Sequence, residues 1–165
     1  MTSLGVASVS LLCCVSCAAL TGPSQPQSIR SIVANPDAFV GQRITVMGRV
    51  DIELNRSLEP CQQGDPRCGW PVSGTVHVVE SGEARVATNS IDVYERRTDG
   101  SEVPWPCTVV SATAADCSPF VADKVTTVTG TFVKERQPVQ TVGSSGGGAT
   151  QVLQYRDIYF LAVSR

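Results

Sequence analysis

Apolar and polar residues alternate strictly along "RITVMGRVDIEL", residues 43–54. A two-residue period is typical of a β-strand with one buried and one exposed face. Asp51 and Glu53 fall on the polar face, and Gly48 lies in the middle of the apolar one. Because a glycine inside a strand usually marks a bulge or a bend, the pattern predicts a long strand that bends near its centre.

The same signature returns in "VTTVTGTFV", where a glycine again follows two residues after a valine. Alternation and turn signals predict five strands in all, over residues 43–54, 74–80, 90–95, 125–133 and 155–165. The Gly/Ser-rich segment 140–151 predicts a flexible loop between the last two strands. Five strands with two glycine bends favour an all-β, five-stranded small barrel, since bent strands let one sheet close on itself.

A short helix is predicted before the first strand. In "SIRSIVANP", residues 28–36, Ile29, Ile32 and Val33 fall on one helical face, and Pro36 ends the segment. We expect this N-terminal helix to pack across one end of the barrel.

Residues 35–50, "NPDAFVGQRITVMGRV", resemble the pattern N-P-x-x-[FY]-x-G-[KQ]-x-[IV]-x-V-x-G-x-V of small bacterial OB-fold lipoproteins. A cysteine-containing loop with Trp70 and the second glycine-centred strand follow in the same order. The resemblance covers most of residues 28–163. It implies an OB-fold-like domain over residues 28–165 and identifies no catalytic residue in this sequence. Residues 96–119 depart from the pattern, because "PWPC" and a cysteine loop stand where many OB-folds have a helix.

The first twenty residues predict an export signal. No charged residue occurs from residue 4 to residue 20, and the apolar core 6–15 has the length of a signal-peptide h-region. The uncharged run is marginal for crossing a hydrocarbon layer of about 30 Å. "CVSC", residues 14–17, resembles a bacterial lipobox, which implies a lipoprotein signal peptide over 1–16 and a lipid-anchored Cys17.

Residues 17–27 would then form a flexible tether to the cell envelope. Ala18 after the lipidated cysteine would direct the protein to the outer membrane of a Gram-negative host. Cleavage after Ala18 or Ala19, which yields a secreted or periplasmic protein, remains an alternative, as does an uncleaved anchor.

Four cysteines remain beyond the leader: Cys61, Cys68, Cys107 and Cys117. An exported chain meets an oxidising compartment, so an even number of cysteines indicates two disulfides with three possible pairings. We favour Cys61–Cys68 and Cys107–Cys117, because each pair lies within one short segment. A zinc site is the alternative, but spacings of six and nine residues differ from the short knuckles of zinc sites.

Two catalytic signatures are absent from the sequence: it has no phosphate-binding P-loop and no H-E-x-x-H. The one histidine, His77, is predicted to point outward between inward-facing Val76 and Val78, and we interpret it as a solvated strand residue. Asp51 and Glu53 could do acid–base chemistry or bind a cation, but alternating polar residues on an exposed strand face are the plainer explanation. We therefore expect no enzyme activity, no cofactor and no metal.

Five residues could form a ligand platform: Trp70, Tyr94, Arg96, Arg97 and Trp105. OB-folds bind oligonucleotides and sugars through aromatic side chains on strands two and three. The competing interpretation is that both tryptophans pack against the disulfides. The net charge of −2 gives no overall positive field that would favour nucleic acid. The sequence thus predicts a non-catalytic binding module for a protein partner or small ligand. An exported binder of nucleic acid or oligosaccharide is the alternative.

Overall fold

The computed structural model describes residues 25–57, 64–145 and 148–165, and the side chains of all of these except 140–153. The elements in chain order are α1 (Ile29–Ala34), the 3-10 turn η1 (Pro36–Ala38), β1 (Arg43–Arg56), β2 (Pro71–Val79), β3 (Ser90–Arg96), β4 (Glu102–Pro104), β5 (Thr108–Ser111), β6 (Ala114–Asp116), β7 (Val125–Ser145) and β8 (Gly148–Ser164). The five predicted strands are all confirmed. Strands β4, β5 and β6 were not predicted, and they fill the segment that departs from the lipoprotein pattern.

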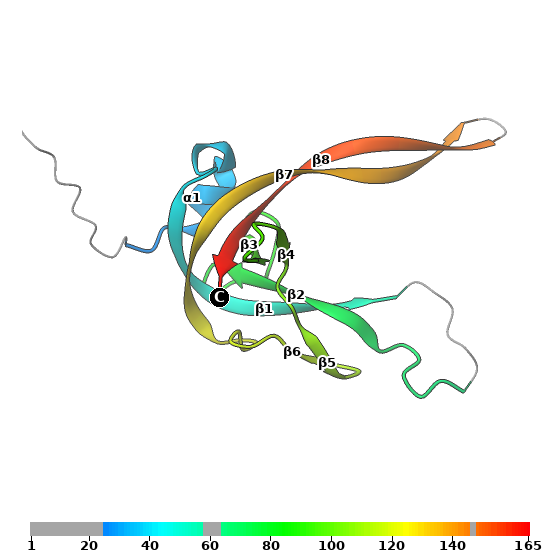
Figure 1. Cartoon of the computed structure of the whole chain (residues 1–165), viewed down its shortest axis with the longest axis horizontal. Helices are drawn as coiled ribbons and strands as arrows, with labels where there is room; N and C mark the ends of the chain where they lie inside the picture. The colour runs from blue at the N-terminus through cyan, green and yellow to red at the C-terminus, as the bar shows by residue number, and fades with distance from the viewer. Residues whose placement is uncertain (1–24, 58–63, 146–147) are drawn as a thin grey trace, which may run out of the picture.

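Five strands close into a ring (Figure 1). β1 pairs antiparallel with β2 and with β7, β2 pairs antiparallel with β3, and β7 pairs antiparallel with β8. A parallel pair between β3 and β8 completes the closure. The expected all-β, barrel-like fold is therefore confirmed at the level of a closed five-stranded sheet.

A side chain at either mid-strand glycine would collide with a neighbouring strand. A Cβ atom on Gly48 would lie 2.3 Å from the Val79 carbonyl oxygen, and one on Gly130 would lie 2.5 Å from the Ala162 carbonyl oxygen. Real side chains do not tolerate such distances, so only glycine lets β1 and β7 turn over the neighbouring strands.

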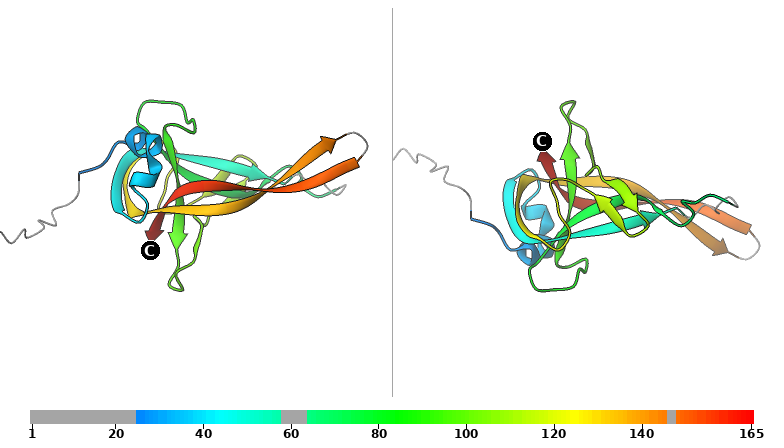
Figure 2. Two further views of the ribbon diagram at one scale, coloured as in Figure 1. Left: turned by 90° about the horizontal axis from the view of Figure 1, so that it is seen from above. Right: turned by 90° about the horizontal axis from the view of Figure 1, so that it is seen from below.

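The barrel interior holds one apolar core, made by the inward side chains of the ring strands. Helix α1 covers part of it with Ile29 and Ile32, which have no exposed surface. The views from above and below show α1 at the end of the barrel from which the N-terminal segment leaves (Figure 2). The prediction of a short helix across one end is confirmed.

The β5–β6 hairpin is closed by a disulfide between Cys107 and Cys117, which confirms that predicted pair. Trp105 packs beside it and is 3% exposed. Its Nε1–H donates to the carbonyls of Cys117 and Ser118 at 3.1 and 3.2 Å. Cys68 is also disulfide-bonded. Its predicted partner, Cys61, lies outside the described residues.

Two hairpins project beyond the ring as arms (Figure 1). One is formed by β1 and β2, and the other by β7 and β8, whose pairing continues to Ser145 and Gly148. The predicted flexible loop over 140–151 is therefore wrong for most of its length. Backbone hydrogen bonds hold this part of the hairpin, whereas its Gly/Ser-rich sequence carries no alternating pattern that would reveal a strand.

Over the residues that the structure describes, no helix combines the length and the apolar character needed to cross a membrane.

Candidate functional site

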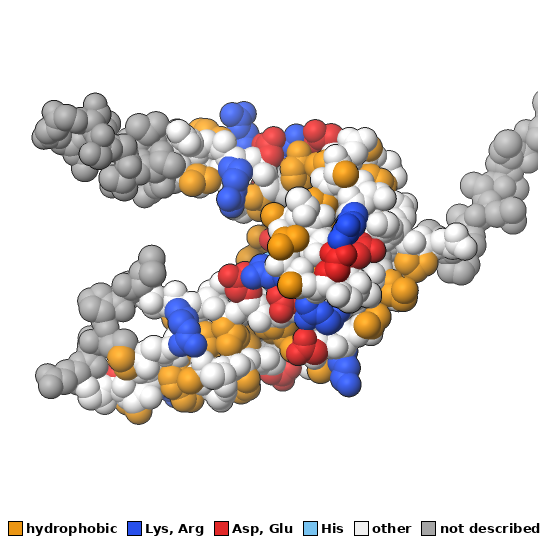
Figure 3. Space-filling model, turned by 180° about the vertical axis from the view of Figure 1, so that it is seen from behind, with side chains coloured by type: hydrophobic (Ala, Val, Ile, Leu, Met, Phe, Trp, Pro, Cys, Tyr) orange, Lys and Arg blue, Asp and Glu red, His pale blue; other side chains and the backbone are white. Residues whose placement is uncertain are grey.

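A groove of about 790 Å³ lies between the two arms. Figure 3 shows this face of the molecule, with a hollow separating the two projecting hairpins. One side is formed by the β1–β2 arm, through Glu53 and His77, and the other by residues 156–159 of β8. The β2–β3 loop, residues 80–89, reaches in between through Arg85, and α1 with η1 forms part of the bottom.

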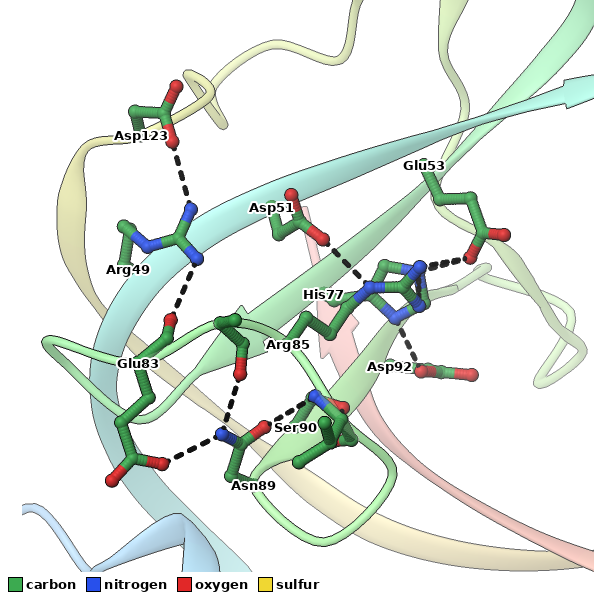
Figure 4. Close-up of polar contacts among 12 residues, drawn as sticks. Arg49, Asp51, Glu53, His77, Glu83, Arg85, Asn89, Ser90, Asp92 and Asp123 are labelled. Carbon is green, nitrogen blue, oxygen red and sulfur yellow. Dashed lines mark hydrogen bonds and ion pairs between the residues drawn. The ribbon is translucent and has the colours of Figure 1, made fainter.

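The Arg85 guanidinium organises the β1–β2 side of the groove (Figure 4). Its Nε–H donates to Asp51 and one Nη2–H donates to Glu53, both at 2.8 Å. Its Nη1–H points at Nε2 of His77, 3.2 Å away. A planar fork that meets three acceptors at once is held in a single orientation.

His77 faces outward from the barrel, because Val76 and Val78 on either side of it are fully buried. It is nevertheless only 5% exposed, so the interpretation of a solvated histidine is wrong. Its Nδ1 lies 2.7 Å from Asp92 Oδ1, and its Nε2 lies 3.2 Å from Nη1 of Arg85. The β2–β3 loop covers the ring, which a strand pattern alone does not reveal.

Asn89 fixes the shape of the β2–β3 loop. It is 1% exposed. Its Nδ2–H₂ donates to the Glu83 carboxylate and the Ala84 carbonyl, both at 2.9 Å, and its Oδ1 accepts from the Val86 amide at 2.8 Å. All of these partners belong to the loop, so the loop is braced from within.

Two arginines attach this loop to the rest of the fold. Arg49 of β1 donates to the Glu83 carbonyl at 3.1 Å, and Arg30 of α1 forms an ion pair with the Glu83 carboxylate. The hydrogen bond from Arg30, followed by the one from Asn89, lowers the pKa of Glu83. Arg85 is therefore presented to the groove by a loop that is tied to both α1 and β1.

The β7–β8 arm is latched at its base to η1. Lys134 donates to Asp37 at 2.9 Å and forms an ion pair with Asp157 at 3.2 Å, while the Tyr159 hydroxyl donates to Asp37 at 3.1 Å. The hydrogen bond from Lys134, and then that from Tyr159, lowers the pKa of Asp37. The hydrogen bond to Asp37, followed by those with Tyr159 and Asp157, raises the pKa of Lys134. These contacts set the direction in which the arm leaves the barrel.

Negative charge predominates on the β1–β3 side of the groove. Asp51, Glu53 and Asp92 bring three carboxylates, and Arg85 is the guanidinium placed among them. The side chains of Glu53 and Asp92 remain 46% and 44% exposed, so both still face solvent. This surface suits a basic ligand better than an acidic one.

The predicted platform residues are divided among four places. Tyr94 and Arg96 lie on the outer face of β3, where Tyr94 stacks on Phe160 with ring centroids 4.1 Å apart. Burial, and then the charges of Asp92 and Glu135, raise the pKa of Tyr94. Arg96 is engaged by Glu102 at 2.7 Å.

The other three platform residues lie elsewhere. Arg97 is exposed in the turn after β3, where its amide donates to the Ser101 carbonyl. Trp105 is buried beside the Cys107–Cys117 disulfide, as its structural interpretation predicted, and Trp70 is half-buried in the β1–β2 arm. The five residues thus form no single surface, and Cys17 lies outside the described residues.

Sequence reasoning missed the groove residues Arg85 and Asp92, and Asn89, which braces the β2–β3 loop. Asp92 lies in the alternating stretch "SIDVYE". The alternation predicts that Asp92 points outward, but it does not predict that His77 is its partner. Arg85 and Asn89 lie in a loop without periodicity, and only the fold brings them to β1 and β2.

Within residues 25–57, 64–145 and 148–165, no group of three or more His, Cys, Asp or Glu side chains is arranged to hold a metal ion. Comparison with family models, curated proteins and solved structures found no match to this chain.

Proposed function

We propose that this chain is a non-catalytic binding module on an OB-fold-like barrel, which engages a protein partner through the groove between its arms. Five ring strands, with the outer face of β2 and β3 lying next to the β1–β2 and β7–β8 hairpins, support the OB-fold assignment. In that fold, this face and these two connections bind ligands.

The observation that carries the proposal is the groove itself, whose charged side is held in place before any partner arrives. Arg85 is fixed by Asp51, Glu53 and His77, and the loop that bears it is braced by Asn89. A site that needs little ordering loses little conformational entropy on binding, so more of the contact energy appears as affinity.

The nucleic-acid alternative is less well supported. Tyr94 has the carboxylates of Asp92 and Glu135 as neighbours, and Arg96 is already paired with Glu102. A phosphate backbone laid over this face would meet negative charge rather than free cations.

Photo-crosslinking in the native host tests the groove. A photoreactive residue at Val86, which is 53% exposed and lines the groove, should give an adduct with one protein. The matched control is the same residue at Val110 of β5, which is 57% exposed and lies away from the groove. Equal adducts from both positions, or none from either, would contradict a protein partner in the groove.

Lipid anchoring at Cys17 completes the proposal, with residues 17–27 as the tether to the cell envelope. The Cys107–Cys117 disulfide supports an oxidising compartment. The intact mass of the protein purified from host membranes, measured before and after reduction, tests the proposed lipid anchor and location. We expect a chain that starts at Cys17, carries diacylglycerol and gains about four hydrogens on reduction of two disulfides. An unprocessed chain with free thiols would contradict it.

A further inference from the structure

In the part of the chain that the structure describes, no strand occupies one edge of β8 over part of its length. β7 pairs with β8 along the whole hairpin, whereas β3 takes the opposite edge only from the Asp92–Phe160 pair onward. Among the residues described, no strand pairs with residues 154–159 on that side. These six residues span about 20 Å, and such an edge presents backbone donors and acceptors to a further strand.

This free edge is also a wall of the groove. Residues 156–159 line the groove on one side, and Arg85, Val86 and Ala87 of the β2–β3 loop line it on the other. An added strand would continue the line of β3, since β3 already occupies the same edge of β8 beyond residue 159.

The two faces of such a strand would meet different surroundings. The register of β3, β8 and β2 places Arg156 and Ile158 on the same sheet face as Asp92, and His77 is paired with Asp92 on that face. Glu53 approaches His77 there to 3.3 Å.

Close to the barrel, the opposite face carries two aromatic rings beside the Lys134–Asp157 ion pair. Tyr159 and Phe132 stack on it with ring centroids 6.1 Å apart. Val33 and Pro36 line the groove beside them. Because alternate side chains of a strand point to opposite faces, an added strand would offer one set to carboxylates and the other to these aromatic rings.

We propose that residues 154–159 bind an extended segment of the partner protein as an added β-strand. Basic side chains of that segment point towards Glu53 and Asp92, and the intervening apolar side chains point towards Phe132 and Tyr159. This inference rests on the proposed function and gives the partner's binding segment a chemistry: alternating basic and apolar residues in an extended chain.

Three labelled hexapeptides test the pattern on the folded domain by fluorescence anisotropy at low salt. Their sequences are Lys-Val-Lys-Val-Lys-Val, the block control Lys-Lys-Lys-Val-Val-Val, and Glu-Val-Glu-Val-Glu-Val, all with capped ends. We expect the first to bind at least about tenfold more tightly than either control, because only it matches both faces. Equal affinities for the alternating and block Lys peptides would overturn the proposal, as would equal affinities for the two alternating peptides.

Backbone methylation separates strand addition from simple charge attraction. In a strand, the amides of alternate residues point to the same edge, so N-methyl groups on the Lys residues and on the Val residues block opposite edges. Of the two methylated peptides, one should bind at least about tenfold more weakly than the unmethylated peptide, and the other should bind as tightly as the unmethylated peptide. Two series that bind equally well would exclude pairing with β8.

A chain variant locates the site. Glu53→Gln should raise the Kd of the Lys-Val peptide by about three- to tenfold, whereas Asp116→Asn on the distant β6 should leave it unchanged. Amide chemical shifts should move at residues 154–159 and not at residues 108–116. If a photoreactive residue at Val86 crosslinks a partner while the peptide fails to bind, the strand-addition proposal is wrong but the proposed function stands. If neither occurs, the proposed function fails as well.

Discussion

Asp92 accepts a hydrogen bond from His77 at 2.7 Å, and the two residues are directly paired across β2 and β3. This bond lies on the outer face of the barrel, yet His77 is almost fully covered. Arg85 closes over the ring from the β2–β3 loop, so a polar network is held under a loop in a place where a small barrel usually meets water.

Removing the Arg85 side chain tests how much this network contributes. Arg85→Ala leaves Asp51 and Glu53 without their cation and uncovers His77, so the free energy of unfolding should fall by about 1 kcal/mol. Urea denaturation at neutral pH measures it. Arg97→Ala, in an exposed turn, serves as the matched control and should change little. The role assigned to Arg85 would be wrong if the two variants were equally stable.

Gly48 should not accept even a methyl group. Gly48→Ala places a Cβ atom 2.3 Å from the Val79 carbonyl oxygen, so β1 must shift away from β2. We expect a loss of about 2–4 kcal/mol in unfolding free energy. Met47→Ala on the same strand is the control, because Met47 is 51% exposed and its loss should cost less than about 0.5 kcal/mol. If Gly48→Ala left the unfolding free energy unchanged, glycine would not be sterically required at the strand bend.

The Cys107–Cys117 disulfide should stabilise the fold and keep Trp105 in place. Replacing both cysteines with serine frees the β5–β6 hairpin, and a crosslink over so short a loop contributes about 2–3 kcal/mol. Chemical denaturation measures this loss. In a Trp70→Phe background Trp105 is the remaining tryptophan, so its fluorescence should shift to the red as the ring meets water. An unchanged spectrum would show that packing alone holds Trp105.

The latch between Asp37 and Lys134 predicts a pH dependence with a definite sign. Its hydrogen bonds hold the pKa of Asp37 below the ordinary 3.8, whereas the unfolded carboxyl titrates near that value. The contribution of this group to stability is therefore complete above about pH 5 and is lost as pH falls through the folded pKa.

Unfolding curves between neutral pH and pH 3 measure this dependence. The stability gap between the wild type and Asp37→Asn should narrow below about pH 4. Lys134→Met should move the pKa of Asp37, followed by carboxyl NMR, back towards its ordinary value. A pKa of Asp37 that is the same with and without Lys134 would contradict the latch.

Most of the fold could be predicted because its signals are local. The alternation over 43–54 marks β1, and Gly48 and Gly130 mark the two bends. The ladder beyond residue 139 could not be predicted, since glycine and serine carry no alternating pattern although their backbones pair. The same limit applies to the β5–β6 hairpin, where the cysteine spacing predicted the disulfide but not the strands that it joins.

The groove could not be predicted for a different reason. His77 and Asp92 are each visible as outward strand positions, but their pairing depends on the register of β2 against β3. Arg85 reaches them from a loop whose shape is set by Asn89, a contact that no sequence period encodes. The sequence suggested Tyr94 and Trp105 as ligand-binding aromatic residues. In the fold, Tyr94 stacks on Phe160 and Trp105 is buried in the core.

The closure of the ring has a consequence for how the chain reaches its native state. β1 pairs with β7, and β3 pairs with β8, so the bonds that complete the barrel join segments far apart in the sequence. Folding that depends on such distant pairs is slow, because each requires a long loop to close first. A ribosome must release residues 160–164 before the ring can form. Until then the nascent chain exposes unpaired strand edges, which makes it a natural client for a holding chaperone.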